Sequence, residues 1–183
     1  DCNSFVSSDK VFSRQVVHMN ASVLAVGTEL TSGQIVNKNA SSISDRLKKF
    51  GIMTLAHLTV PDDRKIILNS LKYLETISDL IFVTGGLGPT SDDFTRDLIS
   101  EWSQQSMKFD ETSWKSIQER LAFRGFQVKE IQKQQCYFPE AAKILTNKEG
   151  TANGFYLQLN KSSGLKNVFV LPGPPREIES IWS

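Results

Sequence analysis

A glycine-rich segment that directly follows a short apolar run constrains this chain more than any other feature. Residues 79–83 read DLIFV, and residues 84–97 continue as TGGLGPTSDDFTRD. A short apolar run without alternation is typical of a buried strand in a parallel sheet. Residues 98–102, LISEW, then continue a helical pattern. The sequence therefore predicts a turn from the C-terminal end of a strand into a helix, which is where open α/β sheets bind ligands.

The residue types in this turn favour a bound phosphate. Gly85, Gly86 and Gly88 permit close approach of the backbone. Their N–H groups can converge on an anion, and the start of the helix adds further donors and a positive dipole end. Thr90 and Thr95 supply hydroxyl groups suited to phosphate oxygens. We therefore predict that these residues bind the phosphate groups of a substrate.

Asp92 and Asp93 conflict with a phosphate site unless a cation accompanies the ligand. Two unit charges 4 Å apart repel by about 4 kcal/mol at an effective dielectric constant of about 20. A divalent ion such as Mg²⁺, Mn²⁺ or Co²⁺ removes the conflict, and carboxylate oxygens suit such ions. The alternative is that Ser91 or Asp92 caps the helix while Asp93 complements its dipole. We predict the metal site, with both aspartates as catalytic and metal-binding residues, because one cap needs only one such residue.

The segment GGLGPTSDDFT resembles the GG-x-GPT-x-DD-x-T signature of the N-terminal domain of competence/damage-inducible protein A (CinA). That domain is part of the wider molybdopterin-binding (MoaB/MogA-like) fold family. Further motifs stand in the family order, namely VGTEL and GQIVN within 26–37, GTA at 150–152 and LPGPPRE at 171–177. The resemblance runs from about Ser22 to the end of the chain. A family segment N-R-K-Q-A-x-x-P-E-G-A is matched by Lys133-Gln134 and by residues 139–142.

The order of apolar patterns predicts an α/β fold with three layers, α/β/α. Within the first hundred residues, strands and amphipathic helices alternate, which indicates a mostly parallel sheet with helices on both faces. Right-handed crossovers then place the loops at 27–33 and 84–90 on the same edge of the sheet. Strands are predicted at 22–26, 52–60, 79–83, 143–145, 155–160 and 167–171, with a hairpin turn at 161–164. Helices are predicted to begin near Asn37 or Asn39, at 61–63, after the glycine-rich turn and before 98–102, at Asp110 and at Glu177.

Other loops add candidate ligand contacts. Glu29 either contacts the ligand or lies in a surface turn, and the family resemblance favours contact. The remaining predicted substrate-binding residues are Pro89, Asn39, Gly150, Gly173 and Pro174. Arg176 is available to bind a phosphate in one interpretation. In the other, its segment only ends a strand and begins a helix, and both interpretations can hold.

Two charged patterns favour a structural role. The pair Asp62-Asp63 has no glycine nest before it, so we expect it to cap a helix. Arg120 and Arg124 lie one helical turn apart and could reach a phosphate. We expect them to form a solvated basic face instead, because charges at helical spacing usually do.

Composition narrows the class of protein. A net charge of +1 gives no electrostatic reason for binding nucleic acid or an anionic membrane. The apolar runs are strand-sized, so no membrane span is expected. Cys2 and Cys136 lie far apart, which fits a reducing cytoplasm rather than a disulfide framework. No P-loop and no G-x-G-x-x-G after the first strand is present, so ATPases and dinucleotide oxidoreductases are disfavoured.

We expect one domain at residues 19–183. Residues 1–18 lack the alternating strand and helix patterns of residues 19–183, and we expect them to be either a natural extension or a segment introduced by cloning. CinA proteins commonly carry a C-terminal nicotinamide mononucleotide deamidase domain, and nothing in this chain resembles it. The family resemblance also implies a homo-oligomer, either a dimer or a trimer.

The resemblance implies two functions. In the CinA family this domain is associated with ADP-ribose pyrophosphatase activity, which implies metal-dependent hydrolysis of a nucleotide-sugar diphosphate to AMP and ribose 5-phosphate. In the pterin branch, the aspartate that matches Asp93 belongs to adenylyl transfer onto molybdopterin, so Asp93 ranks above Asp92. The alternative is a module of molybdenum cofactor biosynthesis type that transfers an adenylyl group, or that binds a nucleotide or pterin without turnover.

Overall fold

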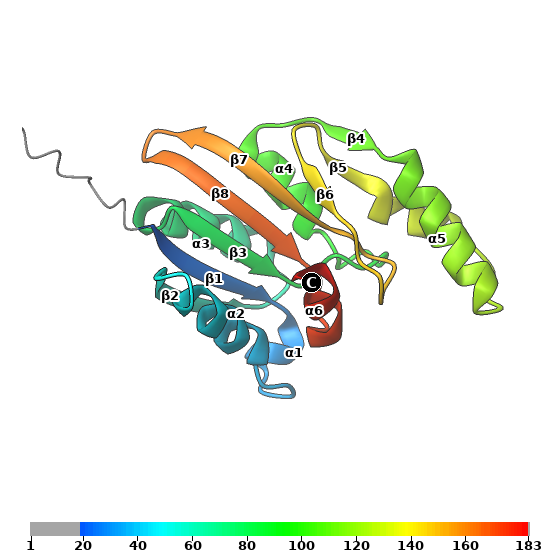
Figure 1. The fold of residues 1–183 in the computed structure, drawn as a ribbon. Helices are drawn as coiled ribbons and strands as arrows, with labels where there is room; N and C mark the ends of the chain where they lie inside the picture. Colours follow the sequence, from blue (N-terminus) through cyan, green and yellow to red (C-terminus); the bar gives the residue numbers. More distant parts are fainter. Residues whose placement is uncertain (1–18, 183) are drawn as a thin grey trace, which may run out of the picture.

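A six-stranded sheet forms the centre of the computed structural model, which describes residues 19–182 (Figure 1). The strand order is β2-β1-β3-β8-β7-β6. The strands are β1 (Asn20–Val26), β2 (Met53–Val60), β3 (Leu80–Thr84), β6 (Lys143–Leu145), β7 (Gly154–Lys161) and β8 (Gly164–Leu171). The segment 1–18, for which we expect a natural extension or a cloning-derived origin, lies outside the described residues.

The sheet is parallel on one side and antiparallel on the other. β2, β1, β3 and β8 run parallel, whereas β8 pairs antiparallel with β7, and β7 with β6. The change of direction occurs at the hairpin between β7 and β8, at the predicted turn. The prediction of a mostly parallel sheet is confirmed, and the C-terminal ends of β1, β3 and β8 meet at one edge.

Helices cover both faces of the sheet, which confirms the three-layer arrangement. The helices are α2 (Lys38–Lys48) and α6 (Pro175–Trp182) on one face, and α3 (Arg64–Ile77) and α4 (Thr95–Ser103) on the other (Figure 1). Side chains of β3 alternate between the two layers. Leu80 and Phe82 belong to the core with α2 and α6, and Ile81 and Val83 to the core with α3 and α4. Both faces of β3 are therefore apolar, as its unbroken run of apolar residues predicted.

Three helices begin at the predicted polar caps. Asn37, Asp63 and Asp110 precede α2, α3 and α5 (Glu111–Phe123), and each side chain accepts a hydrogen bond from the backbone N–H three residues later. Such a cap stabilises a helix by about 1 kcal/mol. Within residues 19–182, no helix combines the length and the apolar character needed to cross a lipid bilayer.

Some short elements were not predicted. They are α1 (Thr28–Thr31), the 3-10 helix η1 (Glu130–Cys136) and the two-stranded sheet of β4 (Met107–Phe109) and β5 (Tyr137–Pro139). These segments show neither a periodic apolar pattern nor an unbroken apolar run such as that of β3. α6 begins at Pro175, two residues before the predicted Glu177, because proline suits the first turn of a helix.

Candidate functional site

A pocket of about 850 Å³ opens at the edge of the sheet where β1, β3 and β8 end. The loops after these strands border it, together with residues of the loop between β6 and β7. The loops at 27–33 and 84–90 therefore share one edge, as the right-handed crossovers predicted. A pocket of this volume suits a small-molecule ligand.

Gly85 and Gly86 adopt backbone conformations that favour glycine, with φ angles of +97° and +64°. A Cβ atom on Gly85 would lie 2.1 Å from the backbone oxygen of Val26. A Cβ atom on Gly86 would lie 2.1 Å from Oγ1 of Thr95. Side chains at either position would therefore push the glycine-rich loop away from β1 and α4, and out of its place at the pocket.

The backbone N–H groups of Gly86, Leu87 and Gly88 have no hydrogen-bond partner within residues 19–182. The N–H of Gly85, in contrast, donates to the carbonyl oxygen of Leu171 at 3.1 Å and continues the ladder between β3 and β8. Backbone donors in folded proteins are normally paired. The loop therefore offers three consecutive unpaired amides at the pocket, an arrangement suited to an anion.

Two buried polar side chains hold the carbonyl groups of this loop. Arg96, which is 3% exposed, donates from Nη1 to the oxygen of Leu87 at 2.6 Å and from Nη2 to that of Gly88 at 2.9 Å. Nε2 of Gln135 also donates to the oxygen of Leu87, at 3.3 Å. Burial lowers the pKa of Arg96 to about 10, and nearby carboxylates, Asp93 foremost, oppose this shift. Arg96 is therefore charged at neutral pH.

Asp92 and Asp93 converge on one hydroxyl group. Oγ1 of Thr90 donates to Asp92 Oδ1 and to Asp93 Oδ2, and the N–H of Thr90 also donates to Asp93 Oδ2 at 3.0 Å. The hydrogen bond from Thr90 is the largest cause that lowers the pKa of the exposed Asp92. The N-cap of α4 is Phe94, without a side-chain bond. The alternative, in which Ser91 or Asp92 caps this helix, is therefore wrong.

The donor set of Asp92 and Asp93 fits a hard divalent cation. Mg²⁺ prefers oxygen ligands and is commonly held by one or two carboxylates that water and substrate phosphates complete. Within residues 19–182, no three His, Cys, Asp or Glu side chains gather into a group that would hold an ion by themselves. Such an ion would therefore depend on the phosphates of a ligand at the unpaired amides, and its presence stays a prediction.

Carboxylates dominate the charged groups of the pocket. The lining includes Lys38 as a cation, and as anions Glu29, Asp62, Asp92, Asp93 and Glu177. A ligand with free phosphate charges would be repelled by most of these groups. The negative charge of the whole pocket, and not of the aspartate pair alone, therefore leads us to expect a cation with the ligand.

Side chains tie down the two outer loops. Asp62 Oδ2 accepts hydrogen bonds from the N–H and the hydroxyl of Thr28, at 2.8 and 2.9 Å. The sequence predicted that Asp62 and Asp63 together cap a helix, but only Asp63 does so. Nδ2 of Asn39 donates to the carbonyl oxygen of Gly173 at 2.7 Å, which joins α2 to the loop after β8.

The loop between β6 and β7 supplies one wall of the pocket and is organised by Asn147. Oδ1 of this buried residue accepts from the N–H groups of Glu149 and Gly150, both at 2.9 Å. Its Nδ2 donates to Oε2 of Glu177 at 2.7 Å. A Cβ atom on Gly150 would lie 2.2 Å from the same Oε2. Glycine at this position therefore leaves room for a pocket carboxylate.

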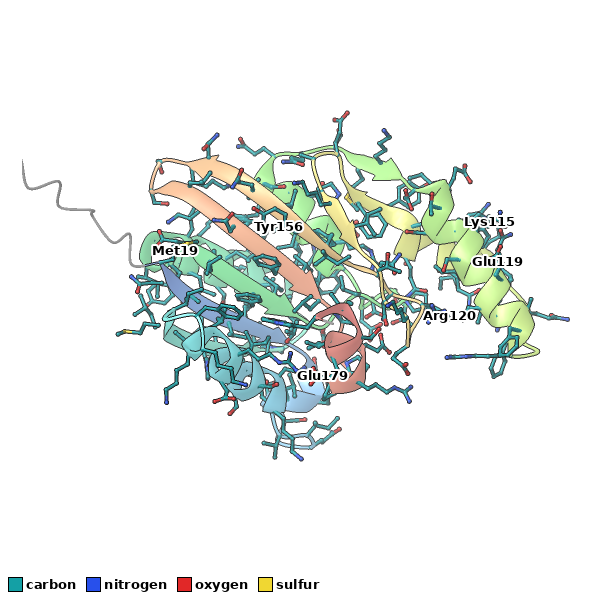
Figure 2. The ribbon with its side chains drawn as sticks, viewed as in Figure 1. Met19, Lys115, Glu119, Arg120, Tyr156 and Glu179 are labelled. Atoms are coloured by element: carbon teal, nitrogen blue, oxygen red, sulfur yellow. The ribbon has the colours of Figure 1, made fainter. Side chains whose placement is uncertain are left out.

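Arg120 is partly buried, in contrast to the predicted solvated basic face, whereas Arg124 is exposed as predicted. Nη2 of Arg120 donates to the carbonyl oxygen of Asn147 at 3.0 Å, and Nη2 of Arg124 to that of Glu149 at 3.2 Å. Figure 2 shows Arg120 on the side of α5 near the loop between β6 and β7. Both arginines therefore support the pocket wall through backbone carbonyl groups.

Most of the predicted site residues line the pocket. They are Glu29, Asn39, Gly85, Gly86, Gly88, Pro89, Asp92, Asp93, Gly173 and Pro174. Three do not: Thr90 binds the two aspartates, Thr95 is buried against Gly86, and Gly150 packs against Glu177. Contact of any of these residues with a ligand stays a prediction.

Sequence reasoning missed Arg96, Gln135, Asn147 and Glu177. A signal existed for Gln135: in N-R-K-Q-A-x-x-P the glutamine lies four residues before the proline. Counting back from Pro139 gives Gln135 rather than the matched Gln134. Arg96 carried no signal, because an arginine in an amphipathic helix is mostly exposed.

Comparisons with known proteins identify the family of this chain. Residues 22–183 match the family described as "Probable molybdopterin binding domain". A competence-damage inducible protein of Desulforamulus reducens is 41% identical over 165 residues, which cover 90% of this chain and 39% of that protein. One from Clostridium botulinum is 38% identical over 164 residues, with the same coverage. The chain therefore spans about two fifths of the length of these relatives.

Solved structures show the same fold. CinA from Thermoplasma acidophilum superposes with a TM-score of 0.78 at 30% identity, over 89% of this chain and 94% of that one. The tungsten cofactor synthesizing protein MoaB from Pyrococcus furiosus gives a TM-score of 0.61 at 18% identity, over 90% and 88% of the two chains, and so supports the fold alone. The chain therefore belongs to the molybdopterin-binding domain family, in the branch of the CinA proteins.

Proposed function

We propose that this domain binds a nucleotide or a pterin through its phosphate groups, together with a divalent cation at Asp92 and Asp93. The observation that carries the proposal is the juxtaposition of the unpaired amides of residues 86–88 with two converging carboxylates in one pocket. Amides without carboxylates would suit a bare anion, and carboxylates without amides would suit a cation alone. Both together suit an anion that carries its own cation.

The residues of the chain divide the work of binding. The N–H groups of Gly86, Leu87 and Gly88 donate to phosphate oxygens, and the carboxylates of Asp92 and Asp93 hold the cation. The wide pocket beyond the loop leaves room for the ring system of the ligand. The family description supports a pterin as this ring system, and the shared chemistry of a phosphate or diphosphate group supports a nucleotide equally.

Direct titration tests this proposal. Isothermal titration calorimetry with ADP-ribose is expected to show binding in the presence of Mg²⁺ and a loss of at least about tenfold in affinity with EDTA. Inorganic diphosphate is expected to compete with ADP-ribose, because it shares only the phosphates. Equal affinity with and without the cation would remove the metal from the proposal. No binding of ADP-ribose or diphosphate under either condition would overturn it.

A second candidate function is hydrolysis of the diphosphate bond of a nucleotide sugar such as ADP-ribose. The pairing of two carboxylates at the phosphate-binding loop favours it, since two carboxylates can hold the divalent ion that such a reaction uses. Water would add across the P–O–P linkage, so that one P–O bond breaks and AMP and ribose 5-phosphate form. A bound divalent ion supplies charge neutralisation and an activated water in such reactions. The amides of residues 86–88 would stabilise charge on the phosphate oxygens as the bond breaks.

Product analysis separates hydrolysis from binding alone. Wild-type protein incubated with ADP-ribose and Mg²⁺, Mn²⁺ or Co²⁺ is expected to release AMP and ribose 5-phosphate, and to release none with EDTA. Binding without any product would leave the domain as a binding module. The cytoplasmic location expected from the two separated cysteines and the dimeric or trimeric state implied by the resemblance are part of this proposal, and cell fractionation and light scattering test them.

A further inference from the structure

We propose that Arg96, assisted by Gln135, is a positioning residue that aims the N–H of Gly88 into the phosphate site. The inference rests on the proposed function, because it assumes that an anion binds at the glycine-rich loop. It adds Arg96, which does not line the pocket, and Gln135 as its assistant, and it gives a physical reason for a buried arginine at the start of α4.

The geometry of the peptide group carries the first step. In a trans peptide, the carbonyl group and the N–H of the next residue point in opposite directions. The carbonyl oxygen of Leu87 accepts from Arg96 Nη1 at 2.6 Å and from Gln135 Nε2 at 3.3 Å. The N–H of Gly88 must therefore point away from these two donors. It has no partner within residues 19–182, and Gly88 lines the pocket.

Burial gives the second step. Arg96 and Gln135 are 3% and 2% exposed, so neither side chain can exchange its carbonyl partner for bulk water. The side chain of Leu87 is also buried and belongs to the core between the sheet and the helices α3 and α4. The Leu87–Gly88 peptide is thus held by a core side chain and by two hydrogen-bond donors. Its orientation does not depend on a ligand, which is how a binding site avoids the cost of ordering a loop on association.

The fork of the guanidinium group gives the third step. Nη2 of Arg96 donates to the carbonyl oxygen of Gly88 at 2.9 Å while Nη1 holds Leu87. An arginine can hold two successive carbonyl groups in fixed geometry, whereas a lysine presents a single ammonium group. Pro89 has no N–H to orient. The bond from Arg96 Nη2 to the oxygen of Gly88 therefore fixes the direction of the backbone that leads from Gly88 to Asp92 and Asp93.

Calorimetry and NMR on variants of the whole chain test this proposal, with inorganic diphosphate and Mg²⁺ as the probe. Arg96→Met removes both hydrogen bonds and is expected to weaken diphosphate binding by about tenfold or more. Arg96→Lys keeps the charge but not the fork, and a loss of about threefold is expected. Lys166→Met is the matched control, because Lys166 is also buried and donates to a carbonyl, that of Ser78, at the opposite end of β3.

The decisive readout is the backbone amide of Gly88 in protein labelled with ¹⁵N-glycine. In the wild type and in Lys166→Met, this resonance is expected to shift on addition of diphosphate, whereas in Arg96→Met the shift is expected to disappear. A folded Arg96→Met that binds diphosphate as tightly as wild type, with the same Gly88 shift, would overturn the inference. So would an equal loss of affinity in Arg96→Met and Lys166→Met, which would indicate general destabilisation.

Two further outcomes are also decisive. If Arg96→Met does not fold, Arg96→Lys and Gln135→Met take its place, and wild-type affinity in both would overturn the inference. If the wild type itself binds no diphosphate, the proposed function fails first and the inference falls with it. The wild-type titration therefore separates failure of the proposed function from failure of the positioning role.

Discussion

The chain contains two Asp-Asp doublets near the starts of helices, and the structure uses them differently. In Asp62-Asp63, both side chains bind protein donors: Asp63 caps α3, and Asp62 holds the N–H and hydroxyl of Thr28. In Asp92-Asp93, neither side chain caps α4, and both converge on the hydroxyl of Thr90 beside unpaired amides. The first pair caps a helix and holds a loop, whereas the second places two carboxylates together beside the unpaired amides of the pocket.

A difference of one residue accounts for the contrast. α3 begins immediately after Asp63, whose extended backbone (φ −126°, ψ 121°) lets its carboxylate reach the N–H three residues later. Before α4 an extra residue, Phe94, takes the N-cap position. Asp93 therefore lies one residue before the N-cap position of α4, and its side chain binds Thr90 at the end of the glycine-rich loop instead. Only the residue next to a helix has the geometry to cap it, so the register of the helix start decides what a doublet can do.

The largest effect that would test this comparison is expected for Asp93→Ala. Removal of a proposed cation ligand should weaken Mg²⁺-dependent diphosphate binding by about 100-fold, because even indirect partners of metal ligands contribute about 10- to 100-fold. Calorimetry measures the affinity, and urea unfolding checks that the fold is retained. Asp92→Ala serves as the parallel variant and should have the smaller effect. Unchanged affinity in Asp93→Ala would remove the difference between the doublets.

Asp63→Ala should affect stability rather than binding. Loss of the cap of α3 is expected to lower the free energy of unfolding by about 1 kcal/mol, while diphosphate affinity stays at the wild-type value. Asp63→Asn, which keeps an accepting oxygen, is the control and should retain most of the stability. Urea denaturation with a two-state fit gives the measurement. A large loss of diphosphate affinity in Asp63→Ala would show that the two doublets act on one site.

The smallest expected effect concerns the hydroxyl that joins the second doublet. The bond from Thr90 lowers the pKa of Asp92 below its usual 3.8, so ionisation of this group favours the folded state. That contribution is present above pH 3.8 and is lost as the pH falls through the lower pKa of the folded state. In Thr90→Val without metal, the pKa of Asp92 should rise toward 3.8. Carboxyl-carbon NMR titration of wild type and variant tests this, and an unchanged pKa would contradict it.

Sequence patterns predicted most of the fold because its main elements are long and periodic. The unbroken apolar run at β3, the stripes of α2 and α3 and the caps at Asn37 and Asp63 all indicate local structure without knowledge of neighbours. The 3-10 helix η1 and the strands β4 and β5 were not predicted, since their segments contain neither a periodic apolar stripe nor an unbroken apolar run. The predicted solvated face was wrong for Arg120, which is partly buried, because spacing along a helix does not reveal which loop will pack against it.

In the candidate site, too, the sequence predicted some residues and missed others. Residues of the motifs, such as Gly86, Asp93 and Gly173, line the pocket where the order of strands placed them. The missed residues instead support the pocket loops through hydrogen bonds to backbone carbonyl or amide groups, as Arg96, Gln135 and Asn147 do. No side-chain pattern records which backbone groups will need a partner, so Arg96 and Asn147 could not be found from their identity, and Gln135 only by alignment with the family segment.

The sequence by itself determined that a strand must turn through glycines into a helix, and that hydroxyl and carboxylate groups come directly after this turn. It did so because local geometry and apolar period depend on near neighbours along the chain. Tertiary structure alone decided which backbone groups of the loop find a partner and which side chains supply it. The N–H of Gly85 donates to the oxygen of Leu171, and the oxygen of Leu87 accepts from Gln135, both far along the chain, whereas the N–H groups of residues 86–88 find no partner within residues 19–182.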